Sequence, residues 1–420
     1  MSLTASATLS VREAQARILD RVRPLPAERM TVSAALGRVL ARPVFARVDV
    51  PPWDNSAMDG YAVRAAEIRP GEPLWVALDL PAGAASGAEL PAGTVARIMT
   101  GAPLPRGADA VIPVELSEGP DGPGAFAGVG DRVRFTASPA AGDHVRPLGE
   151  DVRRGAVAVP EGAVVRAPEV AMAATVGRPT VSVHRRPRVA VVSTGDELVD
   201  PEEAGAPDRI VDSNAWGVAA RVTEVGGDPL ALPRVPDDPE ATREAVRAAL
   251  AADAVVTIGG VSVGARDHVR EALEGCGVEI DFWRVALKPG GPAAFGTTAD
   301  GRPVFALPGN PVSALVTFEL FVRPALLRMQ GHGRCFRAPL RARLAEAVAT
   351  RAGKTHYLRG RLTRAGDGWT VTPTGPQGSG LLSSLVAADG LLVVPSEAEG
   401  LPAGAAVEVL PLHEIHLEAP

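Results

Sequence analysis

Two glycine-rich loops are the segments whose composition most directly suggests chemistry. TIGGVSVGARDHV (257–269) follows a buried apolar run, and LPGNPVSA (307–314) spans an expected helix start that Asn310 would cap. Their candidate ligand-binding residues are Gly259, Gly260, Ser262, Gly264, Pro308, Gly309, Asn310 and Ser313. Free backbone N–H groups and a helix N-terminus attract anions, so such loops bind phosphate. Either loop alone is more typical of an ordinary tight turn, but two on one sheet edge favour a binding site.

Carboxylates follow the strand ends of the same region. STGDELV (193–199) contributes Asp196 and Glu197, PDDPE (236–240) contributes Asp237 and Asp238, and Asp267 follows the first glycine-rich loop. Carboxylates beside phosphate-binding loops favour a hard cation such as Mg²⁺, which bridges carboxylate and phosphate. Helix capping is the alternative for Asp196 and for the aspartate that precedes Pro-Glu.

Two basic residues precede a Pro-Gly-Gly turn in FWRVALKPGGP (282–292). Arg284 suits bidentate recognition of an anion, whereas Lys288 is a compact point charge. A solvated edge strand is the alternative for Arg284. It is weaker for Lys288, because the chain contains 41 Arg but only two Lys, the other being Lys354 in an expected surface turn.

The N-terminal half holds polar segments that are more typical of turns when taken alone. PPWDNSAMDGYAV (51–63) contains Asp54, Asn55 and Asp59, and RPLGEDVRRGA (146–156) contains Asp151. Asp and Asn often form side-chain turns of this kind. Asn55 and Asn310 are two of only three Asn in the chain, so we expect their amide groups to be used in capping or ligand contact.

The periodicity predicts the elements that position these residues. A Ser10-x-x-Glu13 capping box begins a helix to about Arg23, and a second short helix is expected over 32–40. From residue 44 to 139 the chain is rich in short strands. From residue 187, strands at 188–193, 230–235, 254–258, 278–285 and 304–307 alternate with helices at 214–225, 239–251 and 311–329. This alternation predicts a doubly wound parallel α/β sheet, followed by a strand-rich C-terminal part.

The composition excludes several classes of protein. A net charge of −6 argues against a nucleic-acid binder. The two cysteines, Cys276 and Cys335, lack metal-ligand spacing and form no disulfide framework. We find no secretory leader and no apolar run long enough to cross a membrane, so we expect a cytoplasmic protein.

The motifs together resemble one family. DNSAMDGYA, MTGAPLPxGADAV, GEDxxxG, STGDEL, DSN, GGVSVGxxD, KPG and LPGNPVSA occur in this order. This set is similar to the molybdopterin molybdenumtransferases of molybdenum cofactor synthesis and to the E domain of gephyrin. The resemblance covers nearly the whole chain.

The resemblance implies four parts and a homodimer. A discontinuous helical part would comprise 1–44 and 140–186, and a β-rich domain would be inserted at 45–139. A molybdopterin-binding α/β domain would span 187–332, and a C-terminal β barrel would span 333–420. Sites at the dimer interface would explain how Asp59 and Asp151 join the α/β loops. Molybdopterin adenylyltransferase is a candidate partner.

The implied reaction joins adenylylated molybdopterin and molybdate, releasing AMP and giving the molybdenum cofactor. Positions matching site residues of the family, expected to be catalytic, are Asp59, Asp151, Glu197, Asp237, Asp267 and Lys288. Glu197, Asp237 and Asp267 are the candidate Mg²⁺ ligands among them, although the sequence does not decide which acids hold the metal and which activate water. The resemblance adds Thr194, Gly195 and Arg284 to the two loops as binding residues. Arg284 stands where relatives commonly have Lys, and Gly291 replaces a Lys of some relatives, so we assign no basic role to Gly291.

Two other functions remain open from the sequence. A molybdopterin adenylyltransferase would share the α/β domain but would not need the 186 residues before Pro187. A cofactor-binding scaffold without catalysis would keep the fold, although the complete acidic set argues against it.

Overall fold

The computed structural model describes residues 8–85, 87–261, 268–366 and 368–414. The chain divides into two compact units, one of residues 29–183 and one that joins residues 1–28 to 184–420. Each unit is described by itself, and the finer domain boundaries stay predictions. None of the described helices has the length and apolar character needed for a membrane span.

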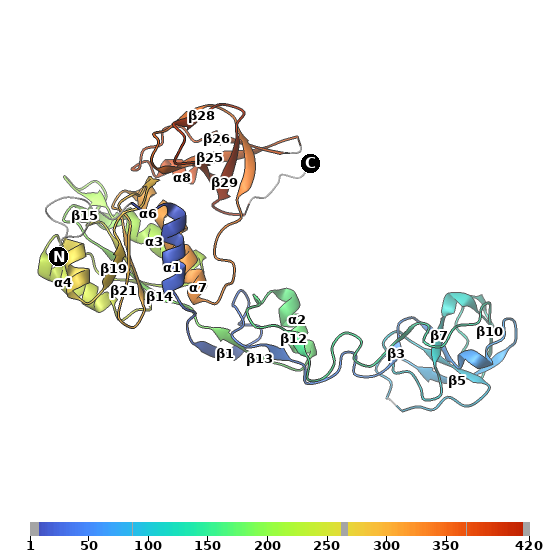
Figure 1. Cartoon of the computed structure of the whole chain (residues 1–420). Coiled ribbons are helices and arrows are strands. Elements are labelled where there is room, and N and C mark those ends of the chain that lie inside the picture. The colour runs from blue at the N-terminus through green and yellow to red at the C-terminus, as the bar shows by residue number, and fades with distance from the viewer. Residues whose placement is uncertain (1–7, 86, 262–267, 367, 415–420) are drawn as a thin grey trace. The chain divides into compact units, whose positions relative to one another are not determined.

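A six-stranded mixed sheet forms the centre of the second unit (Figure 1). Its strand order is β17-β14-β18-β22-β21-β19. The strands are β14 (Arg188–Ser193), β17 (Asp228–Ala231), β18 (Ala254–Ile258), β19 (Glu279–Phe282), β21 (Ala294–Thr297) and β22 (Pro303–Leu307). The first four in the order are parallel, as expected, but β21 runs antiparallel to both of its neighbours, β22 and β19. No described helix separates β19, β21 and β22, and a parallel crossover requires such a connection.

Helices cover both faces of this sheet, as a doubly wound fold requires. Val189 and Val191 of β14 face one core, and Ala190 and Val192 face the other. The first core is covered by α1 (Val11–Arg21), α3 (Ser213–Glu224), α6 (Pro311–Thr317) and α7 (Arg323–Met329). The second is covered by α4 (Pro239–Ala249) and α5 (His268–Gly275). The predicted α/β class is therefore confirmed.

The predicted helix at 311–329 contains a π-helical turn. α6 continues into the turn η4 (Phe318–Val322) and then into α7. Pro324 lies at the start of α7 and has no N–H to donate, which favours a local break in the α-helical hydrogen bonds. The predicted capping box of α1 is present, with the Ser10 hydroxyl 3.2 Å from the backbone nitrogen of Glu13.

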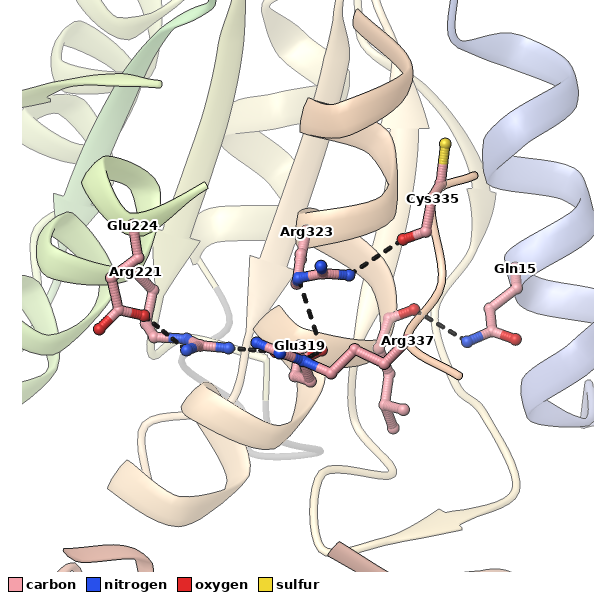
Figure 2. Close-up of polar contacts among 8 residues, drawn as sticks. Gln15, Arg221, Glu224, Glu319, Arg323, Cys335 and Arg337 are labelled. Carbon is pink, nitrogen blue, oxygen red and sulfur yellow. Dashed lines mark hydrogen bonds and ion pairs between the residues drawn. The ribbon is translucent and has the colours of Figure 1, made fainter. Parts of the chain in front are cut away.

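A buried carboxylate in this π-helical turn forms ion pairs with three arginines (Figure 2). The side chain of Glu319 is 4% exposed and pairs with Arg221, Arg323 and Arg337. The Arg337 Nε atom lies 2.8 Å from Glu319 Oε1. Burial lowers the pKa of Arg323, and Arg337 and Arg221 lower it further while Glu319 raises it. We call these four residues the Glu319 cluster; it links α3, η4, α7 and the segment that follows α7.

The C-terminal part is a closed barrel. Its strand order is β25-β26-β23-β29-β27, and β27 pairs again with β25. The strands are β23 (Leu340–Leu344), β25 (Thr355–Ala365), β26 (Gly368–Pro373), β27 (Gly390–Val394) and β29 (Ala406–Pro411), with β20 (Leu287–Lys288) added at β25. Smaller elements are β24 (Val348–Ala349), β28 (Gly400–Leu401) and α8 (Ser383–Val386). The core contains Leu344, Val371, Leu392 and Val409. The predicted C-terminal β barrel is confirmed.

The unit of residues 29–183 contains a seven-stranded sheet of order β7-β4-β6-β5-β10-β8-β9. The strands are β4 (Gly60–Val63), β5 (Leu74–Leu80), β6 (Thr94–Ile98), β7 (Ala110–Pro113), β8 (Ser117–Gly119), β9 (Gly122–Pro123) and β10 (Arg132–Phe135). Two 3-10 turns, η1 (Ala65–Glu67) and η2 (Val114–Leu116), interrupt it. Tyr61, Val95 and Phe135 lie in its core.

A separate core lies beside two-stranded pairings. Val44, Val159, Val176 and Val183 belong to it. The elements are α2 (Ala167–Thr175), β2 (Val44–Phe45) with β12 (Val157–Val159), and β1 (Ala27–Thr31) with β13 (Thr180–His184). A further pair, β3 (Asn55–Ser56) with β11 (Val145–Arg146), lies outside this core, and Val145 packs against the core that contains Ala62 and Ile98.

The helix expected over 32–40 is wrong. Residues 32–37 form successive turns, and Gly37 has a φ of 78°. The backbone nitrogen of Gly37 donates to Val165 O at 2.8 Å, and that of Leu40 donates to Ala163 O at 2.9 Å. These long-range bonds replace the hydrogen bonds that a helix would need within the segment.

Candidate functional site

A cavity of about 720 Å³ lies at the carboxyl ends of β14, β18 and β22. Its lining comes from the residues that follow these three strands, together with 210–214, Asp237, Pro292 and Gly380. The structure therefore brings the described parts of both glycine-rich loops to one cavity. This is the edge of a doubly wound sheet at which ligands bind.

The first glycine-rich loop reaches the cavity through a backbone that excludes side chains. Gly259 has a φ of 88°, and a Cβ there would lie 3.0 Å from Thr194 O. Gly260 has a φ of 63°, and a Cβ there would lie 2.4 Å from Val269 Cγ2. Glycine is thus required at both positions, by conformation and by space. Ser262, Gly264 and Asp267 lie outside the described residues.

The segment after β14 positions two of the predicted acids. The backbone nitrogen of Thr194 donates to Ile258 O and that of Gly195 to Val235 O, both at 3.2 Å. Glu197 follows and lines the cavity with its carboxylate folded over Gly195, where a Cβ would lie 2.8 Å from Glu197 Oε2. Helix capping by Asp196 is wrong, because its Oδ1 instead accepts from the backbone nitrogen of Asp237 at 3.1 Å.

The adjacent aspartates 237 and 238 have separate roles. Asp238 Oδ1 accepts from the backbone nitrogen of Ala241 at 2.8 Å and caps α4, which confirms the capping interpretation for this residue. Asp237 lines the cavity. Its backbone bond to Asp196 joins the loop before α4 to the loop after β14.

Three cavity residues were missed as site residues by the sequence interpretation. Ser193, Asp212 and Asn214 each line the cavity and carry a buried oxygen without a hydrogen-bond partner among the described residues. Asp212 is the N-cap residue of α3, and Asn214 is the second residue of that helix. The DSN motif was the available signal, together with the scarcity of Asn, but the motif alone does not show which oxygen is left without a donor.

The second glycine-rich loop differs from its prediction at Asn310. This residue occupies the N-cap position of α6, but its side chain makes no capping bond, so the predicted capping is wrong. The neighbouring carbonyl of Gly309 instead accepts from Asn214 Nδ2 at 2.6 Å. Pro308, Gly309 and Asn310 line the cavity, whereas Ser313 is buried within α6 and is absent from the lining.

The described lining is acidic. Glu197, Asp212 and Asp237 contribute carboxylates, and no Lys, Arg or His is among the described lining residues. Arg284 and Lys288 are exposed and do not line it. Lys288 lies in β20, and its backbone is in register with His356 of the neighbouring parallel strand β25. Burial lowers the pKa of His356, with smaller contributions from Lys288 and Lys354, against a hydrogen bond to Arg351 O that raises it.

The barrel contributes a loop to the cavity through Gly380. Arg359 of β25 is fully buried and donates from Nη2 to Gly378 O at 3.0 Å and from Nε to Ser384 Oγ at 2.9 Å. Its Nη1 atom has no partner among the described residues, and burial lowers its pKa. Arg359 therefore supports the 378–380 loop, and no motif in the sequence predicted this.

Asp59 and Asp151 belong to the unit of residues 29–183. Asp59 Oδ1 accepts from the backbone nitrogen and from the hydroxyl of Thr100, both at 2.7 Å, and these bonds lower the pKa of Asp59. Asp151 is exposed, and its backbone nitrogen donates to Val50 O at 2.9 Å. Asn55 is buried with an unpartnered Oδ1.

The acids of the cavity have the donor chemistry of a Mg²⁺ site but not a complete protein cage. Among the described residues, no group of three or more His, Cys, Asp or Glu is arranged to hold a metal ion. Mg²⁺ commonly binds one or two carboxylates and takes its other ligands from water and substrate phosphates. Glu197 and Asp237 fit that mode, while Asp267 is outside the described residues.

Known protein families match three successive regions of this chain. Residues 9–177 match the MoeA N-terminal region, residues 190–328 match a probable molybdopterin binding domain, and residues 341–412 match the MoeA C-terminal region. Molybdopterin molybdenumtransferase 2 of Mycobacterium tuberculosis is 37% identical over 95% of this chain and 98% of its own length. The Haemophilus influenzae molybdopterin molybdenumtransferase is 34% identical over 97% of this chain and 99% of its own.

A solved structure agrees over the same length. The molybdopterin biosynthesis MoeA protein of Pyrococcus horikoshii OT3 is 30% identical, with a TM-score of 0.80, over 96% of this chain and 100% of its own. Sequence motifs, family regions and fold thus agree from the first helix to the barrel. The chain belongs to the molybdopterin molybdenumtransferase family.

Proposed function

We propose that this protein inserts molybdate into adenylylated molybdopterin, releasing AMP and giving the molybdenum cofactor. The cavity at the strand ends carries the proposal, because it combines glycine-rich loops with carboxylates that lack ion-pair partners among the described residues. It lies in the region that matches a probable molybdopterin binding domain, and relatives over the whole chain are named molybdopterin molybdenumtransferases.

The two loops would bind the phosphates. The donors would be backbone N–H groups of these loops that the protein does not itself use, since the N–H groups of Gly259 and Val312 already donate to Leu307 O and Ser379 O. Such donors add no side-chain charge. Glu197 and Asp237 would hold Mg²⁺, which would neutralise phosphate charge and polarise the phosphorus–oxygen bond that breaks. In the proposed reaction an oxygen of molybdate would attack the AMP phosphorus, the phosphoanhydride P–O bond would break, and AMP would leave with the molybdate oxygen while the bridging oxygen stays on the molybdopterin phosphate. Molybdenum, having given up that oxygen, would bind the two dithiolene sulfurs, whose protons are released to solvent.

The remaining predicted residues would manage charge around the incoming oxyanion. Lys288 and Arg284, which lie outside the cavity lining, would offset the charge of molybdate as it approaches. Asp59 stays ionised because Thr100 donates two hydrogen bonds to it. We propose that Asp59 and Asp151 reach the reacting groups in a homodimer, and that Asp267 completes the acidic set. The proposed substrate supplier is molybdopterin adenylyltransferase, acting as a partner.

Turnover with defined substrates tests this function. Purified protein would be incubated with Mg²⁺, molybdate and adenylylated molybdopterin, and AMP and metallated cofactor would be measured over time. We expect AMP release that depends on molybdate and is lost in Asp59→Asn. Asp121→Asn is the matched control, because it changes an exposed turn aspartate of the same unit.

Each alternative function gives a different result in this assay. Formation of adenylylated molybdopterin from ATP, without molybdate-dependent AMP release, would identify an adenylyltransferase. Tight pterin binding without turnover would identify a cofactor-binding scaffold. Either outcome would contradict the proposed transferase reaction.

A further inference from the structure

Three buried oxygens of the cavity lack donors in the described part of the chain. They are Ser193 Oγ, Asp212 Oδ2 and Asn214 Oδ1. Ser193 is 3% exposed and Asp212 is 4% exposed. A buried acceptor without a donor is costly, so an arrangement with several of them in one cavity indicates that a ligand supplies the missing groups.

The carboxylate of Asp212 is held in one orientation. Its Oδ1 atom accepts from the backbone nitrogen of Ala215 at 3.1 Å and caps α3. Its own backbone nitrogen donates to Val199 O at 2.9 Å. These bonds fix the side chain and leave Oδ2 as a buried acceptor without a donor among the described residues, in a residue that lines the cavity.

The amide of Asn214 is fixed as well. Its Nδ2 atom donates to Gly309 O at 2.6 Å. A carbonyl can only accept, so this contact requires nitrogen on that side and places Oδ1 on the other. The side chain therefore joins the start of α3 to the second glycine-rich loop and adds a second oriented acceptor.

Paired acceptors select a ligand edge that carries N–H donors. A phosphate or molybdate oxygen is itself an acceptor and would be repelled by these oxygens. Asp212 and Asn214 are therefore not suited to bind the anionic end of a substrate. The 2-amino-4-oxopyrimidine edge of a pterin presents an amino group beside a ring N–H. The free Asp212 Oδ2 and Asn214 Oδ1 atoms would accept from these two donors, the carboxylate with a charge-assisted bond. The backbone N–H groups of the two loops are suited to bind phosphate, whereas the acceptor oxygens of Asp212 and Asn214 are suited to bind the ring.

We propose that Asp212 and Asn214 bind the amino-pyrimidine edge of the pterin and determine the selectivity of the cavity for that ring. The proposal rests on the proposed function and adds the residues that recognise the substrate's ring. The competing occupant of these oxygens is a divalent cation, which the experiment separates from a pterin ring.

A pair of ligands that differ at one group tests the proposal. 6-Hydroxymethylpterin phosphate and the corresponding lumazine phosphate differ at position 2, where the amino donor becomes an oxo acceptor, and at the adjacent N1, which gains a hydrogen. We expect the wild-type protein to bind the pterin roughly 10- to 100-fold more tightly in equilibrium fluorescence titrations, because the oxo group would face unsatisfied acceptors. Equal affinities for the two ligands would overturn the proposal without any variant.

Substitution then assigns the selectivity to its residue. Asp212→Asn keeps an oxygen that can cap α3 but removes the charge, and we expect the preference for pterin to fall by about tenfold. Glu240→Gln changes an exposed acidic residue of α4 and is the matched control, which should keep the wild-type preference. An Asp212→Asn protein that is folded by circular dichroism and retains the full preference would contradict the assignment.

Titrations with Mg²⁺ and with EDTA separate the cation from the ring. If Asp212→Asn weakens Mg²⁺ binding and leaves the pterin preference unchanged, these oxygens are cation ligands and the proposal is wrong. Molybdate-dependent AMP release, measured on the same preparation, tests the proposed reaction separately from the proposed recognition of the ring. Turnover without ring selectivity would overturn this inference alone, whereas selectivity without turnover would contradict only the proposed reaction.

Discussion

The cavity and the Glu319 cluster treat buried acids in opposite ways, although both belong to the same unit. Glu319 has three arginine partners, so its charge is fully engaged within the protein (Figure 2). Asp212 is equally buried, yet one of its oxygens has no donor among the described residues. The difference separates an acid that holds elements together from an acid that is available to a ligand.

The two edges of the central sheet repeat this contrast. Asp253, just before β18, accepts from both terminal nitrogens of Arg185 and from the backbone nitrogen of Arg188. At the other end of β18 lie Gly259 and the cavity, where Glu197 and Asp237 have no ion pair within the described segments. The amino edge therefore serves stability, and the carboxyl edge is left open for a ligand.

Removing the shared carboxylate of the Glu319 cluster gives the largest expected effect on the free energy of unfolding. Glu319→Gln would leave three partly buried guanidinium groups without their shared carboxylate, so we expect the free energy of unfolding to fall by about 3–5 kcal/mol in urea titrations. Glu224→Gln is the control, because Glu224 is a more exposed partner of Arg221 and should cost less than about 1 kcal/mol. Similar losses for both variants would contradict the central role of Glu319.

A change in the cavity backbone has the next largest expected effect. Gly260→Ala forces a Cβ onto a backbone with a φ of 63° and into Val269 Cγ2 at 2.4 Å. We expect a loss of about 1–3 kcal/mol by urea unfolding, and weaker binding of adenylylated molybdopterin. Gly277→Ala is the control for backbone strain alone, since it has a φ of 84° but nothing within 4 Å of the added Cβ. An equal loss in both variants would rule out the steric part of the argument.

Low pH should weaken the ion pair of Asp253 with Arg185 at the amino end of the central sheet. Burial raises the pKa of Asp253, but the Arg185 hydrogen bonds and the Arg188 backbone bond outweigh it, so the pKa is lowered overall. This ion pair stabilises the fold above the ordinary pKa of an aspartate, and its contribution is lost as the pH falls through the lowered pKa. The difference in unfolding free energy between wild type and Asp253→Asn should therefore shrink from pH 7 to pH 3. A difference that stays constant with pH would show that the charge of Asp253 is not involved.

Two helix starts provide the smallest and most closely matched test. Asp238→Ala removes a capping bond to Ala241 and should cost about 1 kcal/mol. Asn310→Ala removes a side chain that makes no capping bond, so we expect less than about 0.5 kcal/mol. Urea unfolding of the two variants gives the comparison. A larger loss for Asn310→Ala would restore the capping role predicted from the sequence.

Local patterns were sufficient to predict much of the fold. The Ser10 capping box and the alternating cores of β14 follow from side-chain spacing along single elements. The motifs also identified Gly259, Gly309 and Glu197, because strand ends in a parallel sheet meet at one edge. A strand at 278–285 was predicted and contains β19, but β21 and its antiparallel pairing with β19 and β22 were not, since pairing direction depends on connections between elements.

The unpartnered oxygens could not be predicted for a related reason. Whether Asp212 Oδ2 has a donor depends on residues distant in the chain, and so does the bond from Asn214 to Gly309. Asn310 illustrates the limit from the other side: its type and position are typical of a cap, but its side chain makes no such bond. Residue type indicates what a side chain can do, and only the packed structure shows which atoms remain free.

Molybdate-dependent AMP release by a Glu197→Gln, Asp237→Asn double variant tests the central claim most directly. The assay uses the full chain with adenylylated molybdopterin and Mg²⁺, at protein concentrations corrected for the folded fraction. We predict a rate at least about 100-fold below wild type, with an unchanged free energy of unfolding, because these acids serve the ligand and not the fold. A folded double variant that releases AMP within about twofold of the wild-type rate would contradict the placement of the reaction in this cavity.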